Sequence, residues 1–389
     1  MSPGAIGRRT FAALANPNYR RWYAGQGISL VGTWMQTIAQ GWLVYTLTGS
    51  GTQLGLVVAL QMVPVLILAP YAGVIADRVN KRKLIIGVQA GMAVLALILG
   101  ILTVTGAVRL WEVYVLAAAL GIATAFDNPT RQAFVMELVG PDHVRNAVTL
   151  NSVLVNAGSY VAVIASLLLL DTSTLRPSTP APRSRGQLRE GLRYVASTPA
   201  LAVPLAMMGV IGALAYEFQV VLPLVARETF GGGAEVYGFL TAAMGAGAVV
   251  GGLIVAGSGR TGTRAVVSAS FGFGVAILLA AAAPTLPLEL VAMTLVGAAS
   301  VTFLAVGNST LQLASRPDMR GRVMSLWAVA FLGTTPIGGP IAGYVSENAG
   351  GRAGLLMGGL TCIAAAGVAA GILSQRGRAL ISRHSLRGA

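Results

Sequence analysis

The chain has 389 residues, of which 55% are hydrophobic and 10% are charged, and its mean hydropathy is +0.73. Soluble domains carry roughly 25% charged residues, so this composition excludes a soluble globular protein. The net charge of +14 would suggest nucleic acid in a soluble protein, but here the arginines lie between apolar stretches, and we expect an all-α polytopic membrane protein that binds no nucleic acid.

The apolar stretches predict the transmembrane helices. A bilayer core of roughly 30 Å is crossed by about 20 apolar residues in a helix. The N-terminal segment has basic residues but no cleavable signal pattern, so the first span is expected to be an uncleaved anchor. Eleven spans are predicted, at 24–46, 53–76, 84–105, 111–127, 148–170, 201–225, 236–257, 265–285, 288–313, 324–345 and 353–373.

The segment 171–200 differs from the spans because it is polar and rich in Pro, Ser and Arg. Its first part reads as a flexible linker. Its second part places Leu188, Leu192 and Val195 on one helical face, which suits a short surface helix at the lipid headgroups. We therefore predict an N-terminal membrane bundle over 1–170, a cytoplasmic linker over 171–200, and a six-span bundle with a basic tail over 201–389.

The basic residues predict the orientation, because cytoplasmic loops of membrane proteins collect Lys and Arg. With the N-terminus, the linker and the C-terminus all in the cytoplasm, 24 of the 27 basic residues lie inside. A single crossing at 148–170 would put the linker outside and leave 12 inside and 15 outside. The first half therefore lacks one crossing, or it contains a re-entrant hairpin broken near Asn156–Gly158 that protein must cover.

One sequence motif resembles a known family signature. The stretch Gly73-x-x-x-Asp77-Arg78-x-Asn80-Lys81-Arg82 is similar to the G-x-x-x-D-[RK]-x-G-[RK]-[RK] signature of the major facilitator superfamily, found between its helices 2 and 3. Asn80 replaces a glycine. Because Asn tolerates the left-handed conformation better than most residues, we expect the tight turn to persist.

Further stretches resemble the bacterial exporter branch of this superfamily, which includes enterobactin exporters and macrolide-efflux-like proteins. They are Asn18–Trp22, Asp127–Ala133, Asn146–Ser152, Glu190–Tyr194 and Arg320–Ser325. The resemblance implies the major facilitator fold, with twelve helices in two bundles joined by a cytoplasmic linker. It also implies that one span of the twelve is missing near 157–158, where the start of helix 5 passes directly into the second half of helix 6.

The resemblance implies a cytoplasmic gate. In the superfamily the residue that matches Asp77 contacts the start of helix 11, where the helix dipole favours a carboxylate. Lys81 or Arg82 would pair with Asp127 at the end of the fourth span, and a charge cluster that only sets topology is the alternative. The gating motif comprises Gly73, Asp77, Arg78, Lys81, Arg82, Asp127 and Arg131.

Glu217 is the candidate for proton coupling. It lies eight residues from the outer end of the span 201–225, or about 12 Å deep along a helix. Charged residues at depth are costly and face a cavity or a partner. The alternative is a carboxylate that reaches water or bonds to Tyr216 or Gln219.

The predicted substrate cavity follows from the resemblance, since helices 1, 4, 7 and 10 line the cavity in the superfamily. The implied lining candidates are Gln36, Gln40, Trp34, Gln219 and Asn308. Amides beside aromatic rings suit an amphipathic ligand better than a sugar, and interhelical hydrogen bonding is the alternative. Gly247-x-x-x-Gly251 and Gly338-Gly-Pro340 are expected to be packing sites, with bending at Pro336 and Pro340.

The predicted function is a secondary active transporter of the bacterial inner (cell) membrane. It would export an amphipathic small molecule, drug-like or siderophore-like, by proton antiport with alternating access. A phosphate-binding loop, a metal-ligand cluster and a nucleophile triad are not evident, so we expect a monomer that is no enzyme and has no cofactor or metal. The alternative is a transport-inactive remnant with a scaffold or sensing role, because the missing part of helix 5 normally carries an antiporter Gly-Pro motif.

Overall fold

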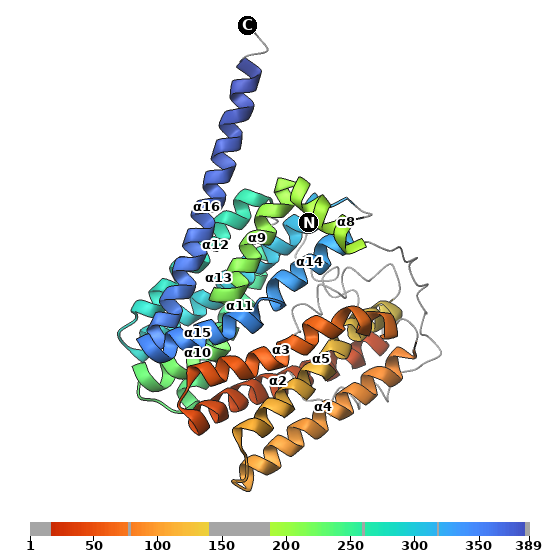
Figure 1. The fold of residues 1–389 in the computed structure, drawn as a ribbon, viewed down its shortest axis with the longest axis vertical. Coiled ribbons are helices and arrows are strands. Elements are labelled where there is room, and N and C mark those ends of the chain that lie inside the picture. Colours follow the sequence, from red (N-terminus) through yellow and green to blue (C-terminus); the bar gives the residue numbers. More distant parts are fainter. Residues whose placement is uncertain (1–16, 77–78, 140–186, 259–260, 317–318, 386–389) are drawn as a thin grey trace. The chain divides into compact units, whose positions relative to one another are not determined.

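The structure is a computed structural model that describes residues 17–76, 79–139, 187–258, 261–316 and 319–385. Every regular element within these ranges is a helix (Figure 1). Large apolar side chains such as Val104, Leu253 and Leu313 are 90%, 70% and 70% exposed. Within the described residues, nine helical stretches are long and apolar enough to cross a membrane, so these exposed side chains suit contact with lipid. The predicted polytopic all-α class is confirmed.

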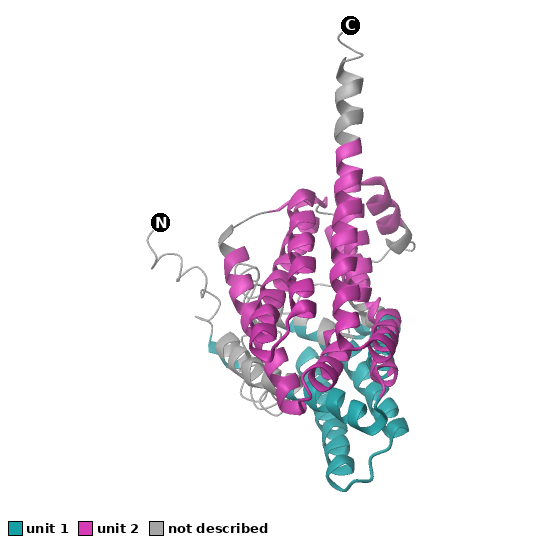
Figure 2. Cartoon of the chain, turned by 90° about the vertical axis from the view of Figure 1, so that its left-hand side faces the viewer, with its two compact units in different colours: residues 1–49, 57–183 teal, residues 50–56, 184–389 magenta. Residues whose placement is uncertain are grey.

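The chain divides into two compact units, one of residues 1–49 and 57–183 and the other of residues 50–56 and 184–389 (Figure 2). The helices of the first part of the chain are α2 (Pro17–Thr48), α3 (Gly51–Ala76), α4 (Lys81–Val104) and α5 (Leu110–Val139). They coincide with the first four predicted spans, and those at 53–76, 84–105 and 111–127 are among the nine long apolar stretches. The fifth, 148–170, lies outside the described residues together with the junction at 157–158.

Helix α5 is longer than predicted. The span was expected to end at 127, but the helix continues to Val139. It therefore takes in Asp127, at the predicted end of the fourth span, and Arg131 beyond it. Hydropathy falls where charged residues begin, whereas the backbone hydrogen bonds of a helix continue past the apolar stretch.

Unit 2 contains all six spans predicted after the linker. Two of the six are broken, at Tyr216–Glu217 and at Gly333–Thr334. The second break lies just before Pro336, close to the predicted bend. The helices are α8 (Gln187–Ser197), α9 (Pro199–Ala215), α10 (Phe218–Leu224), the π-helical turn η3 (Val225–Thr229), α11 (Ala234–Ser258), α12 (Thr263–Ala282), α13 (Leu286–Ala314), α14 (Arg320–Leu332), α15 (Thr335–Ala349) and α16 (Gly351–Ser385).

Close helix packing in unit 2 depends on glycines. A Cβ atom at Gly247 would lie 2.6 Å from the carbonyl carbon of Thr294, and one at Gly251 would lie 2.6 Å from the Cα atom of Ala298. Both contacts join α11 to α13, so the backbones of these helices touch directly. The predicted small-residue packing site is confirmed, as small residues let helices approach closely in membranes.

The second part of the linker forms the predicted short helix, but only part of its predicted apolar face is buried. Val195 of α8 is buried, whereas Leu192 is 50% exposed. A Cβ atom at Gly191 would lie 3.2 Å from the Cβ atom of Arg322 in α14. Glu190 also forms a 2.7 Å ion pair with Arg322. Helix α8 is therefore docked on α14 through Glu190 and Gly191. Of the predicted apolar face, Val195 is buried and Leu192 is exposed.

Candidate functional site

Glu217 lies at a break between two helices. Helix α9 ends at Ala215 and α10 begins at Phe218, and the backbone angles of Glu217 are φ −82° and ψ 36°. Pro223 in α10 has no N–H to donate to the preceding turn. Because a helix end leaves backbone groups without intrahelical partners, the break creates a polar point inside an otherwise apolar span. The span predicted at 201–225 is present, and it is interrupted at Tyr216–Glu217.

A second helix break faces the first. The side chain of Glu217 is 4% exposed, and its carboxyl group accepts a hydrogen bond from the hydroxyl of Thr335, the first residue of α15. Its Oε2 atom lies 3.5 Å from the position that a Cβ atom would take at Gly339. Its Oε1 atom accepts no hydrogen bond from the described residues. The two breaks therefore enclose a buried carboxyl group that keeps one oxygen available.

Aromatic side chains hold the break in place. The Tyr216 hydroxyl donates a 2.9 Å hydrogen bond to the carbonyl oxygen of Ser300 in α13. The ring centroid of Tyr216 lies 5.1 Å from that of Phe273 and 5.1 Å from that of Phe331. Such ring pairs add stability beyond the area that they bury. Tyr216 thus fixes the backbone next to Glu217, and the partner of the carboxyl group is Thr335 rather than Tyr216.

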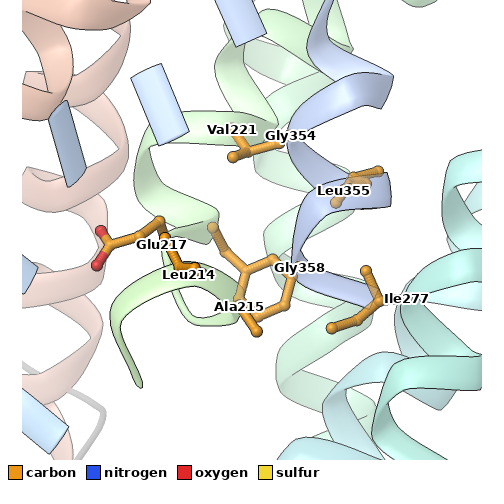
Figure 3. Close-up of a pocket in the computed structure, with 9 residues that line it drawn as sticks. Leu214, Ala215, Glu217, Val221, Ile277, Gly354, Leu355 and Gly358 are labelled. Atoms are coloured by element: carbon orange, nitrogen blue, oxygen red, sulfur yellow. The ribbon is translucent and has the colours of Figure 1, made fainter. Parts of the chain in front are cut away.

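A small pocket lies beside the break. It is lined mainly by apolar residues of α9, α10, α12 and α16, among them Leu214, Ile277 and Leu355. Its cavity volume is about 10 Å³, no more than a single water molecule requires. In Figure 3 the carboxylate of Glu217 points away from the other labelled residues. The pocket is too small for a drug-sized ligand, and the carboxylate faces the opposite side.

A buried polar cluster joins α4 and α5 in unit 1. Asp127 is 4% exposed and Gln89 is fully buried. The Gln89 amide donates a 2.8 Å hydrogen bond to Oδ1 of Asp127, and Arg131, one helical turn further on, pairs with Oδ2. The predicted gate residues Asp127 and Arg131 are thus brought together, but the partners of Asp127 are Arg131 and Gln89 rather than Lys81 or Arg82. Sequence reasoning missed Gln89, an amide within an apolar span.

The gating motif is described in part. Gly73 lies in α3, and Lys81 and Arg82 begin α4, whereas Asp77 and Arg78 lie outside the described residues. Asn80 has φ −64° and ψ 108°, and its side-chain oxygen accepts a hydrogen bond from the N–H of Lys83 at 3.1 Å. The predicted left-handed turn is therefore wrong at this position: Asn80 is extended and caps α4, a role in which Asn is among the preferred residues.

The cavity candidates are divided between the two units. Gln36 and Gln40 lie on α2 in unit 1, where Gln40 is buried, and the side chain of Trp34 is outside the described set. In unit 2, Gln219 is exposed on α10, and Asn308 on α13 accepts a hydrogen bond from Gln312. A common cavity for these residues stays a prediction.

One buried carboxyl group was not singled out from the sequence. Glu289 in the first turn of α13 is 1% exposed. The charge of Arg352 acts on it, and Arg352 also donates a hydrogen bond to the carbonyl oxygen of Ala283 at the end of α12. Two features of the sequence could have indicated this contact. Glu289 lies near the start of a predicted span, and Arg352 lies in another loop predicted on the outer side. In the described part of the chain, no three His, Cys, Asp or Glu side chains gather as metal ligands would.

Comparison with protein families identifies the chain. A family model described as a transmembrane secretion effector of the major facilitator type matches residues 8–159 and 153–382. The chain belongs to the major facilitator superfamily. The two matched segments meet at 153–159, and this is where the charge count and the resemblance to major facilitator exporters predict a missing span.

Curated relatives of this major facilitator chain include an enterobactin exporter and a staphyloferrin A transporter. It is 26% identical to the enterobactin exporter EntS of Shigella boydii over 358 residues, which are 84% of this chain and 85% of that protein. It is 28% identical to the staphyloferrin A transporter of Staphylococcus aureus over 149 residues, or 38% of each chain. None of these matches favours the transport-inactive alternative.

Solved structures confirm the major facilitator fold. A bacterial homologue of the human lysosomal transporter Spinster superposes with a TM-score of 0.65 at 13% identity, over 93% of this chain and 96% of that one. The nucleoside transporter NupG superposes with a TM-score of 0.63 at 14% identity, over 94% and 99%. At these identities the likeness concerns the fold alone.

Proposed function

We propose that this chain is an exporter of amphipathic small molecules, siderophore-like or drug-like, and that proton antiport drives it with alternating access. Its place would be the bacterial inner membrane, as a monomer with both termini and the linker in the cytoplasm. The match to an enterobactin exporter over 84% of the chain supports the substrate class and the direction. The distribution of basic residues supports the orientation.

The observation that carries the coupling mechanism is the carboxyl group of Glu217 between two helix breaks. Buried ionisable residues in membrane helices mark ion and proton pathways, and broken helices commonly build the coupling sites of transporters. The hydroxyl of Thr335 holds the carboxyl group, and Oε1 accepts no hydrogen bond from the described residues. A proton can bind at such an oxygen and neutralise the charge.

The gate and the cavity belong to the same proposal. The motif from Gly73 to Arg82 would control access at the cytoplasmic end of α3, with the Asp127–Arg131 pair as its support in unit 1. Gln36, Gln40, Trp34, Gln219 and Asn308 would contact the substrate. One span near 157–158 would be absent, and both the charge count and the divided family match support this.

Glu217→Gln in proteoliposomes tests the coupling. The variant keeps the shape of the side chain and removes the titrating group. We expect transport of an amphipathic fluorescent dye and of a catecholate siderophore, driven by an imposed pH gradient, to be lost. Exchange of substrate at equal concentrations without a gradient should persist. Gradient-driven transport at the wild-type rate in Glu217→Gln would refute the coupling role.

The matched control is Glu235→Gln. Glu235 lies in the first turn of α11, where its Oε1 atom accepts a 2.9 Å hydrogen bond from the N–H of Gly233 on the protein surface. The substitution removes one carboxylate from the same unit without touching either helix break. We expect Glu235→Gln to keep gradient-driven transport, so that a loss in Glu217→Gln is not an effect of net charge.

A further inference from the structure

Glu347, in the last turn of α15, binds the first turn of α3. Its Oε2 atom accepts hydrogen bonds from the Ser50 hydroxyl at 2.8 Å, from the Thr52 hydroxyl at 2.6 Å and from the Thr52 N–H at 2.9 Å. Ser50 also accepts the N–H of Gln53 at 3.2 Å. One carboxylate oxygen therefore collects three donors from the start of another helix, and hydrogen bonds to a charged acceptor are stronger than neutral ones.

The negative charge of Glu347 is favourable near the N-terminus of α3 and unfavourable near the C-terminus of its own helix, α15. The C-terminal end of a helix carries a partial negative charge, which disfavours a carboxylate, and the N-terminal end carries a partial positive charge, which favours one. Glu347 lies two residues before the end of α15 at Ala349, so its own helix does not stabilise it. The three donors at the N-terminus of α3 compensate for this position.

Glycines on both helices let the two backbones touch. A Cβ atom at Gly51 would lie 2.7 Å from the carbonyl oxygen of Gly343, and one at Gly55 would lie 2.8 Å from the backbone nitrogen of Pro340. A Cβ atom at Gly339 would in turn lie 3.1 Å from the carbonyl oxygen of Gly55. Each helix thus presents two glycines four residues apart, the spacing of close helix pairs in membranes.

The contact lies at a place where the chain passes from one unit to the other. Ser50–Leu56 belongs to unit 2, and α3 continues from Val57 as part of unit 1. The opposite end of α3 is followed along the chain by Lys81 and Arg82 at the start of α4, which the proposed orientation places on the cytoplasmic side. The Glu347 contact is then at the outer end of α3.

We propose that Glu347 is a positioning residue for transport, which holds the outer end of α3 against α15 in one transport state and releases it in the other. This inference rests on the proposed alternating access. The hydrogen bonds of Glu347 are short-range and directional, so they are lost when the helices separate. The glycines allow the two helices to pack closely in the same register when they meet again. Glu347 would thereby set the relative populations of the two transport states.

Distances between two spin labels test the proposal without substrate or a pH gradient. The labels are attached to Leu56→Cys in α3 and Tyr344→Cys in α15, both exposed residues, after Cys362→Ala has removed the buried native cysteine. In this background we expect one dominant short distance. Glu347→Gln should raise the ratio of long to short distances roughly tenfold or more, because a charged acceptor contributes more than a neutral one. Glu347→Asp should restore part of the short population.

Two further variants separate this role from a general loss of stability. Thr52→Val removes one donor and keeps the charge of Glu347, so we expect a smaller shift in the same direction. Glu235→Gln should leave the distances unchanged. Unchanged distances in Glu347→Gln would overturn the proposal, as would an equal shift in Glu235→Gln. Because no transport is measured, this result is independent of the Glu217 test, and the failure of one proposal is distinguishable from the failure of the other.

Discussion

The close packing of α11 on α13 predicts a large effect of a single methyl group. At Gly247 of α11, a Cβ atom would lie 2.6 Å from the carbonyl carbon of Thr294 in α13. Carbon atoms pack at roughly 3.5–4.0 Å, so Gly247→Ala must separate the two helices locally by about 1 Å. Overpacking of this kind costs about 1–3 kcal/mol. Alanine favours a helix by up to about 1 kcal/mol over glycine, and this offsets only part of the cost.

Gly245→Ala is the matched control on the same helix. Gly245 is exposed, and a Cβ atom there would meet nothing within 4 Å. We expect Gly247→Ala to lower the melting temperature in detergent by roughly 2–8 °C, by the scaling of about 2–4 °C per kcal/mol for domains of this size. Gly245→Ala should leave it unchanged or raise it slightly. Equal melting temperatures for the two variants would refute the conclusion that the backbones of α11 and α13 are in direct contact.

Two further predictions concern caps and buried charge. Asn80→Ala should destabilise the protein by about 1 kcal/mol and Asn80→Gly by only a few tenths, measured by chemical unfolding; a left-handed residue 80 would instead make glycine stabilising. Arg352→Ala should destabilise by about 1.5–3 kcal/mol, because it removes a charged hydrogen-bond donor to the carbonyl oxygen of Ala283 and the cation that acts on Glu289. Adding Glu289→Gln should recover part of that loss, and purely additive effects of the two substitutions would contradict a coupling between them.

The positions of the helices could be predicted from the sequence because hydropathy reports them directly. A stretch of about 20 apolar residues in water-free surroundings has few alternatives to a helix, since every backbone group must find its partner within the segment. Helix ends followed hydropathy less well. Charged residues such as Asp127 end the apolar stretch but do not end α5, which continues to Val139.

Individual site residues were harder to predict, because their partners come from other helices. The pairing of Asp127 with Arg131 required knowing that both lie on one helix, and the contact with Gln89 required the packing of α4 on α5. At Asn80, the family signature suggested a glycine-like turn, whereas the side chain can also cap a helix. Sequence alone does not decide between these two uses of asparagine.

The helix breaks explain how a carboxyl group can lie inside an apolar bundle. A break leaves backbone groups without intrahelical partners, so the surroundings of Glu217 are more polar than hydropathy suggests. The same region also reaches α3. A Cβ atom at Gly339 would lie 3.5 Å from Oε2 of Glu217 and 3.1 Å from the carbonyl oxygen of Gly55. One glycine of α15 thus separates the candidate proton site from the α3–α15 contact that Glu347 holds. Because packed helices shift between discrete arrangements rather than deform continuously, a change in the charge of Glu217 has a short physical route to that contact.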